Sequence, residues 1–230
     1  MTAEDRSFTP AIEDYAKAIY ALEQGEGGAV STTALADRLE VTPASASGMV
    51  RRLGELGLVT HVPYRGVRLT DQGVRVALEV LRHHRLLELY LATSLDVPWD
   101  RVHDEAEVLE HVISEELEAL IAAKLGHPTR DPHGDPIPTA DLTLDEEPTE
   151  RLADQQPGAR GRLVRVSDFD PAMLRYLAER GIAPGDAFAV VDRQPFDGPL
   201  FVRFTGGDGE GDVHVLGGAL AAAMRVEVER

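Results

Sequence analysis

The 230-residue sequence contains no cysteine. This absence excludes a disulfide framework and thiolate metal ligands, so any metal ion must be bound by His, Asp or Glu side chains. The sequence also lacks an apolar run of about 18 residues, the length that spans a bilayer. Its polar, acidic N-terminus is unlike a signal peptide. We therefore expect a cytoplasmic protein without a membrane partner.

Positive charge is scarce, with 23 Lys and Arg residues against 40 Asp and Glu residues and a net charge of −17. This excess of acid argues at first against a nucleic-acid partner, because DNA binding draws on Lys and Arg. Residues 41–85 differ from the rest, since they hold seven arginines against three acidic residues, a local net charge of +4. This basic stretch keeps DNA open as a partner.

The first 70 residues carry helix-start signals. Pro10 suits the first position of a helix over residues 10–24, and Ser31 can cap a short second helix. Thr42, followed by proline, starts a third helix that Gly57 ends. The two short helices and the hairpin pattern LVTHVPYRGVRLT after them predict a winged helix-turn-helix.

Two longer helices are predicted next, one capped by Thr70 and one that begins after Pro98 and continues to Gly126. Their wide apolar stripes exceed what a winged helix needs and predict a dimer interface. Residues 126–158 are rich in Pro, Asp and Gly and predict a linker. Residues 159–230 hold five short β-like runs and one helix, which is the pattern of a small β-barrel.

The second of these long helices contains the segment VHDEAEVLEH, residues 102–111. At about 100° per residue, four potential ligands of this segment share a helical face about 100° wide that borders the apolar stripe. They are His103, Glu107, Glu110 and His111. The preceding helix carries His84 and Glu88 at i, i+4 spacing, which also places two ligand types on one face. This pattern predicts divalent-metal binding.

The same side chains are compatible with several roles. Glu and His on a helix more often face solvent than bind an ion, and His84 alone would be interpreted as a partly buried surface histidine. A metalloenzyme uses the same residue types but needs an open coordination position and a base, and no separate base is evident. A winged-helix regulator that binds an organic ligand is the other alternative. We expect neither enzyme activity nor a small organic substrate.

The order of these motifs resembles that of the diphtheria-toxin-repressor-like metalloregulators, which include iron-dependent and manganese-dependent repressors. HRLLELYL followed by VHDEAEVLEH lies downstream of the winged helix and ahead of DPHGDPIP. The resemblance covers almost the whole chain and implies a mainly α fold with a small β domain. The implied parts are a winged helix-turn-helix (1–72), a helical dimerisation and metal-binding domain (73–145), a linker (146–158) and a FeoA-like, Src-homology-3-like β-barrel (159–230).

The resemblance also implies two metal sites in each subunit. One would consist of His84, Glu88 and His103. The other would consist of Asp14, Glu107, Glu110 and His111. Asp170 is implied as a further oxygen ligand of the former, and capping the helix PAMLRYLAERG is its alternative role. Because Asp14 lies on the first helix of the DNA-binding domain, metal would tie that domain to the dimer core, and metal-free protein should bind DNA poorly.

Two positions indicate which metal binds. Where iron-type members have cysteine and methionine, this sequence has the carboxylates Glu107 and Asp14. Oxygen ligands with imidazole suit Mn(II), which we predict as the activating ion, and Fe(II), Co(II), Ni(II) or Zn(II) can substitute. An Fe(II)-responsive repressor is the alternative. Lys17 departs from some manganese-type members, which have a ligating glutamate there, and this departure argues against their close binuclear arrangement.

The resemblance further implies a homodimeric repressor that binds double-stranded DNA at palindromic operators. Residues near the start of the recognition helix face the groove, and arginines further along meet phosphates. The candidates for DNA contact are Thr42, Ser45, Ser47, Arg51, Arg52 and, in the wing, Arg65. For Arg52, a solvated helix charge is an equally good interpretation.

Overall fold

The computed structural model describes residues 8–144, 148–196, 198–205 and 211–229. These residues form two compact units, which we call the first and second units. The first unit consists of the described residues up to His84 together with 109–114 and 138–144. The second consists of residues 85–108, 115–137 and those described beyond 147. Among the described residues, no helix is long and apolar enough to cross a membrane.

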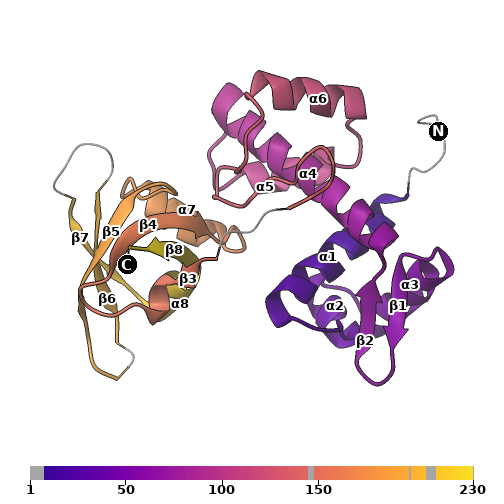
Figure 1. The fold of residues 1–230 in the computed structure, drawn as a ribbon, viewed down its shortest axis with the longest axis horizontal. Helices are drawn as coiled ribbons and strands as arrows, with labels where there is room; N and C mark the ends of the chain where they lie inside the picture. The colour runs from indigo at the N-terminus through magenta and orange to yellow at the C-terminus, as the bar shows by residue number, and fades with distance from the viewer. Residues whose placement is uncertain (1–7, 145–147, 197, 206–210, 230) are drawn as a thin grey trace. The chain divides into compact units, whose positions relative to one another are not determined.

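The first unit begins with three helices and a hairpin (Figure 1). They are α1 (Pro10–Glu26), α2 (Thr32–Arg38), α3 (Pro43–Glu55), β1 (Val59–Val62) and β2 (Gly66–Leu69). Both short helices have the predicted caps, since Ser31 Oγ accepts a hydrogen bond from Ala34 N at 3.1 Å and Thr42 Oγ1 accepts one from Ser45 N at 3.2 Å. The predicted winged helix-turn-helix is confirmed.

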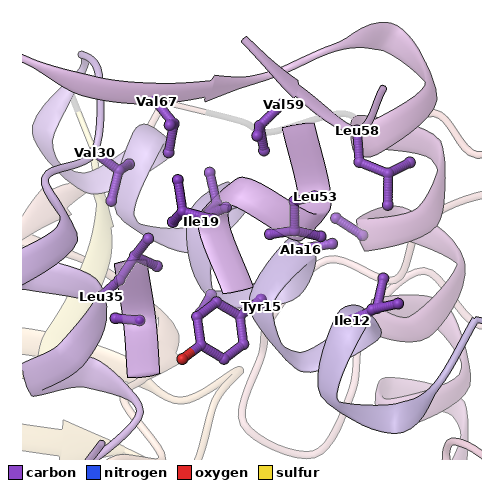
Figure 2. Packing of buried hydrophobic residues seen from close by; sticks show 14 of the residues in the cluster. Ile12, Tyr15, Ala16, Ile19, Val30, Leu35, Leu53, Leu58, Val59 and Val67 are labelled. Carbon is purple, nitrogen blue, oxygen red and sulfur yellow. The ribbon is translucent and has the colours of Figure 1, made fainter. Parts of the chain in front are cut away.

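One hydrophobic core joins these elements (Figure 2). Ile19 of α1, Leu35 of α2 and Leu53 of α3 are fully buried in it. Val30, just before α2, exchanges backbone hydrogen bonds with Val67 of β2 at 2.8 and 2.9 Å, which fixes the hairpin to the helices. Because close-packed cores transmit displacements, a force on α1 reaches the recognition helix α3.

Three further helices follow the hairpin, namely α4 (Asp71–Ser94), α5 (Val102–Leu109) and α6 (Glu115–Lys124). The prediction of one continuous helix after Pro98 is wrong, because α5 ends at Leu109. Glu110 and His111 lie in the turn that follows. There His83 Nδ1 donates to the Glu110 carbonyl at 3.1 Å. In a continuous helix, this carbonyl oxygen would instead accept a hydrogen bond from the backbone N–H of the same helix.

The C-terminal part of the second unit is an antiparallel sheet with the strand order β3-β8-β4-β5-β6-β7 among the described residues (Figure 1). Its strands are β3 (Glu150–Arg151), β4 (Arg160–Val166), β5 (Ala187–Arg193), β6 (Leu200–Thr205), β7 (Val213–Leu216) and β8 (Met224–Val228). Helices α7 (Pro171–Ala178) and α8 (Gly218–Ala222) accompany them. The five predicted strands are all present, and the predicted fold class is confirmed.

The linker predicted over residues 146–158 is shorter than expected. Strand β3 pairs with β8, and Leu152, in a 3₁₀ turn after β3, is fully buried in the core of the sheet. A two-residue strand is too short to produce an alternating pattern. The C-terminal domain therefore begins near residue 150.

The Pro-rich segment before it is also built into the fold. Residues 130–138, which we call the acidic loop, include buried Asp131 and His133. The Asp131 carboxylate accepts hydrogen bonds from His133 N at 2.8 Å and Asp135 N at 2.9 Å. Gly134 has φ +87° and lies so close to β4 that an added Cβ would overlap a backbone carbonyl. Proline and glycine here form an ordered turn, so the prediction of a linker from residue 126 is wrong.

Candidate metal centre

The first candidate cluster lies in the first unit and consists of Asp14, Glu110 and His111. Their ligand atoms lie within 4.8 Å of one another. His111 Nε2 lies 3.0 Å from Asp14 Oδ1 and 3.4 Å from Glu110 Oε1. The Glu110 side chain is 0% exposed. Two carboxylates and one imidazole, brought from α1 and from the turn after α5, form a donor set suited to a divalent ion.

His84 joins this first cluster in the structure. Its Nδ1 contacts the second carboxylate oxygen of Glu110. The predicted grouping of His84 with Glu88 is also present, since the two residues, one turn apart on α4, offer ligand atoms within 4.8 Å of each other. The turn after α5 carries Glu110 to His84, a contact that helical spacing does not reveal.

Two further residues of α1 contact the first cluster, namely Lys17, which the resemblance placed at a ligand position of some manganese-type members, and Glu13, which sequence reasoning missed. Lys17 Nζ donates to Glu110 Oε1 at 2.6 Å, and His111 Nδ1 lies 2.6 Å from Glu13 Oε2. Both residues lie on α1 within one turn of Asp14, so their positions on the helix were the available signal. A second partner on Nδ1 fixes the imidazole ring and leaves Nε2 facing the carboxylates.

The second candidate cluster lies in the second unit and centres on Glu88, whose side chain is 1% exposed. Its Oε1 lies 3.3 Å from His103 Nδ1, which is also 3.3 Å from Asp168 Oδ2. The hydrogen bond to Asp168, followed by that to Glu88, raises the pKa of His103 to about 10. Burial opposes ionisation of Asp168, but the His103 contact outweighs it and lowers the pKa of this carboxyl.

The acidic loop completes this second cluster with two residues that sequence reasoning missed. Glu88, Asp131 and His133 offer ligand atoms within 4.8 Å of one another. His133 is fully buried, and its Nε2 donates to the Trp99 carbonyl at 2.7 Å. Its Nδ1 lies 3.6 Å from Glu88 Oε2 and has no hydrogen-bond partner among the described residues. A backbone acceptor on one nitrogen, with the other facing carboxylates, is the usual arrangement of a metal-ligating histidine.

The carboxylates of this region repel one another. Burial raises the pKa of Asp131 well above its usual range, and neighbouring Asp135 and Glu88 raise it further. Arg85 offsets part of this charge, since its Nη2 lies 3.2 Å from Asp135 Oδ1. Arg165 Nη1 of β4 lies 3.1 Å from the same oxygen. A divalent cation between these carboxylates would relieve the remaining repulsion, so the donor set fits a metal ion.

Two predicted ligands have different surroundings from those expected. Asp170 is half-buried and caps α7, with its Oδ1 accepting from Ala172 N at 2.9 Å, and the carboxylate beside His103 is Asp168 instead. Glu107 was predicted with Asp14 and Glu110, and it offers a ligand atom within 4.8 Å of one from Glu110. Its Oε1 also lies 3.8 Å from His103 Nε2, with a side chain 41% exposed. Capping of α7 and metal binding would both use the carboxylate of Asp170, and in the structure this carboxylate caps the helix.

The predicted DNA contacts lie on α3 and the wing of the first unit. Thr42 and Ser45 are bonded to each other at 2.9 Å, and Ser47 Oγ donates to a backbone carbonyl within α3. Arg51 and Arg52 are exposed on α3, and Arg65 is exposed in the turn of the hairpin. The predicted contacts thus sit on one helix and one hairpin that share a core.

A winged helix-turn-helix followed by buried carboxylate and imidazole clusters defines a metal-dependent DNA-binding regulator. Three family models match the chain in order. They are "Iron dependent repressor, N-terminal DNA binding domain" over residues 7–67, "Iron dependent repressor, metal binding and dimerisation domain" over 70–139 and "FeoA domain" over 150–228. The chain belongs to the family of metal-dependent transcriptional repressors typified by the diphtheria toxin repressor. This is a family of DNA-binding repressors, not of enzymes.

Individual relatives agree over most of their length. The diphtheria toxin repressor of Corynebacterium efficiens is 35% identical over 192 residues, which are 79% of this chain and 83% of the relative. That of Corynebacterium diphtheriae is 31% identical and covers 94% of this chain and 96% of its own. A solved manganese-dependent transcriptional repressor in complex with manganese is 44% identical, with a TM-score of 0.87 over 95% of this chain and 100% of its own.

Proposed function

We propose that this chain is a manganese-activated repressor that binds its operator when metal occupies both clusters. The observation that carries the proposal is the donor set of the first cluster, in which Asp14 and Glu110 supply carboxylate oxygens and His111 supplies imidazole. No cysteine is available anywhere in the chain. Oxygen with imidazole favours Mn(II) over softer ions, although affinity order alone lets Co(II), Ni(II) or Zn(II) bind.

The residues divide between two proposed sites. The first site would use Asp14, Glu110, His111, His84 and, one turn before Glu110, Glu107. The second would use Glu88, His103, Asp131, His133 and Asp168. When bound, the ion supplies positive charge that lets neighbouring buried carboxylates stay ionised together. An Fe(II)-responsive repressor is the second candidate, because the relatives of this chain include proteins named iron-dependent repressors.

The link to DNA runs through α1. Asp14 lies on α1, and α1 shares its core with α3, so a constraint on Asp14 is transmitted to the recognition helix. We expect a coupling free energy of about 1 to 3 kcal/mol between metal and DNA binding, and DNA should raise metal affinity by the same factor. Arg51 and Arg65 would contact phosphates on either side of the groove.

A homodimer on a palindromic operator is part of the proposal. Apolar side chains of α5 and α6 are exposed in the second unit, namely Val108 (71%), Leu117 (46%) and Leu120 (62%). Large exposed apolar side chains on neighbouring helices are typical of a subunit interface. Two-fold symmetry of that interface would place two recognition helices on related half-sites.

A gel-shift assay on the DNA upstream of the gene tests the function. Full-length protein is titrated first with chelator and then with Mn(II), Fe(II) or Zn(II). We expect a shifted complex with Mn(II) and none with chelator. Glu107→Gln and His111→Ala should lose the Mn(II) response, while the matched control Glu105→Gln, an exposed position of α5, keeps it. Equal DNA binding with and without metal would refute the proposed function.

A further inference from the structure

An ammonium group contacts the first cluster from within the chain. Lys17 Nζ donates to Glu110 Oε1 at 2.6 Å, with the Lys17 side chain 18% exposed and that of Glu110 fully buried. Lys17 lies on α1, one turn after Asp14, and Glu110 lies in the turn after α5. The lysine therefore places a positive charge on a carboxylate that a divalent ion would also bind.

Glu110 needs this charge when metal is absent. A buried carboxylate without a partner is strongly disfavoured. Among the described residues, the carboxylate of Glu110 also contacts His84, through Oε2, and His111, whose Nε2 lies 3.4 Å from Oε1. Lys17 Nζ, at 2.6 Å, lies closer to Oε1 than His111 Nε2 does at 3.4 Å. Lys17 thus brings an ammonium group into direct contact with this oxygen.

We propose that Lys17 is an internal competitor of the divalent ion, which holds Glu110 in the metal-free protein and sets the metal concentration at which the first cluster fills. This inference rests on the proposed function. Two cations beside one carboxylate repel each other, and the lysine must yield part of its contact when the ion binds. Removal of the lysine charge therefore favours the ion and disfavours the metal-free protein.

This reasoning separates Lys17 from a lysine that only stabilises the fold. Loss of a purely structural contact would lower both the stability of the metal-free protein and its metal affinity, because the ligands would lose their positions. Loss of a competitor lowers the stability of the metal-free protein and raises its metal affinity. The two quantities measured on the same variant thus move in opposite directions.

The experiment compares Lys17→Met and Lys17→Gln with wild type. Mn(II) affinity is measured by competition with a fluorescent chelator, and unfolding temperature is measured in excess chelator. We expect first-cluster affinity to rise about tenfold or more, with a lower unfolding temperature without metal. Lys17→Arg keeps the charge and should resemble wild type. Lys124→Met, at an exposed position of α6, is the matched control and should change neither quantity.

The inference is overturned if both uncharged variants bind Mn(II) as wild type does, or more weakly. Retained binding at the second cluster shows in the same titration that each variant is folded. If wild type binds Mn(II) but its DNA binding ignores metal, the proposed function fails while the competition by Lys17 is still measured. If the wild-type protein binds no ion at the first cluster, competition by Lys17 predicts that the Lys17→Met variant binds one there. Absence of binding in the wild type and in the variant overturns the inference.

Discussion

Metal binding at the second cluster should release a proton from His133. Burial by itself lowers the pKa of this imidazole, but its contact with the Glu88 carboxylate and the charge of Asp131 raise the pKa to about 9. At pH 7 the ring therefore carries two protons. One, on Nε2, is donated to the Trp99 carbonyl, and the other is on Nδ1, the nitrogen that faces Glu88. A metal ion must displace the Nδ1 proton.

The magnitude follows from the distance between pKa and pH. At pH 7 the imidazolium form of His133 exceeds the neutral form about a hundredfold, so displacement of this proton alone should make metal affinity rise about tenfold per pH unit up to pH 9. The stability of metal-free protein moves the opposite way. Because folding raises the pKa of His133 from 6.5 to about 9, protonated His133 stabilises the folded protein by about 3 kcal/mol at most. This stabilisation is fully present below pH 6.5 and is lost as the pH rises through 9.

Isothermal titration with Mn(II) in two buffers of different ionisation enthalpy counts the protons released at pH 7. We expect about two, one from His133 and one from His103, whose pKa is raised to about 10 and which the proposed second site also uses. His133→Gln should remove one proton from the count, and His127→Gln, an exposed position, should not. A pH-independent affinity, or an unchanged count in His133→Gln, would refute this account of the second cluster.

Three other variants, one of them a double substitution, test separate parts of the structure. Gly134→Ala would force a Cβ against Val164 O at a φ of +87°, so it should cost about 2 kcal/mol or more in urea unfolding with chelator, and a neutral effect would contradict the close approach. Asp14→Met combined with Glu107→Cys should shift activation in a DNA-binding titration from Mn(II) toward Fe(II), Co(II) or Ni(II), and an unchanged preference would count against the proposed role of oxygen ligands. Asp170→Ala should lose a helix cap worth about 1 kcal/mol while metal affinity stays constant, and weaker metal binding would restore it as a ligand.

The helices of the DNA-binding domain were predictable because their signals are local. The cap Thr42 and the fully buried Leu53, about three turns later, belong to one helix, and the structure reproduces both. Ligands on one helix were likewise predictable, since spacing alone puts Glu107 next to His103. The end of α5 was not, because the contacts that hold Glu110 come from residues 27 and 93 positions away.

The acidic loop was missed for a related reason. Its prolines and glycines favour a flexible chain in a local interpretation, whereas burial of Asp131 and His133 depends on α4 and β4, which lie far away in sequence. The prediction of Asp170, where the structure has Asp168 beside His103, failed for the same reason. Two acidic residues near a helix start satisfy the local pattern equally, and only the tertiary position of His103 distinguishes them.

The attachment of the acidic loop to β4 limits how this protein can be recombined with its relatives. Val166 N donates to the His133 carbonyl at 2.9 Å, and Arg165 reaches Asp135. A chimaera joined at residue 150, where the C-terminal domain begins, would separate these partners although it respects the domain boundary. Exchange of C-terminal domains therefore requires residues 130–138 to be transferred together with the sheet that they contact.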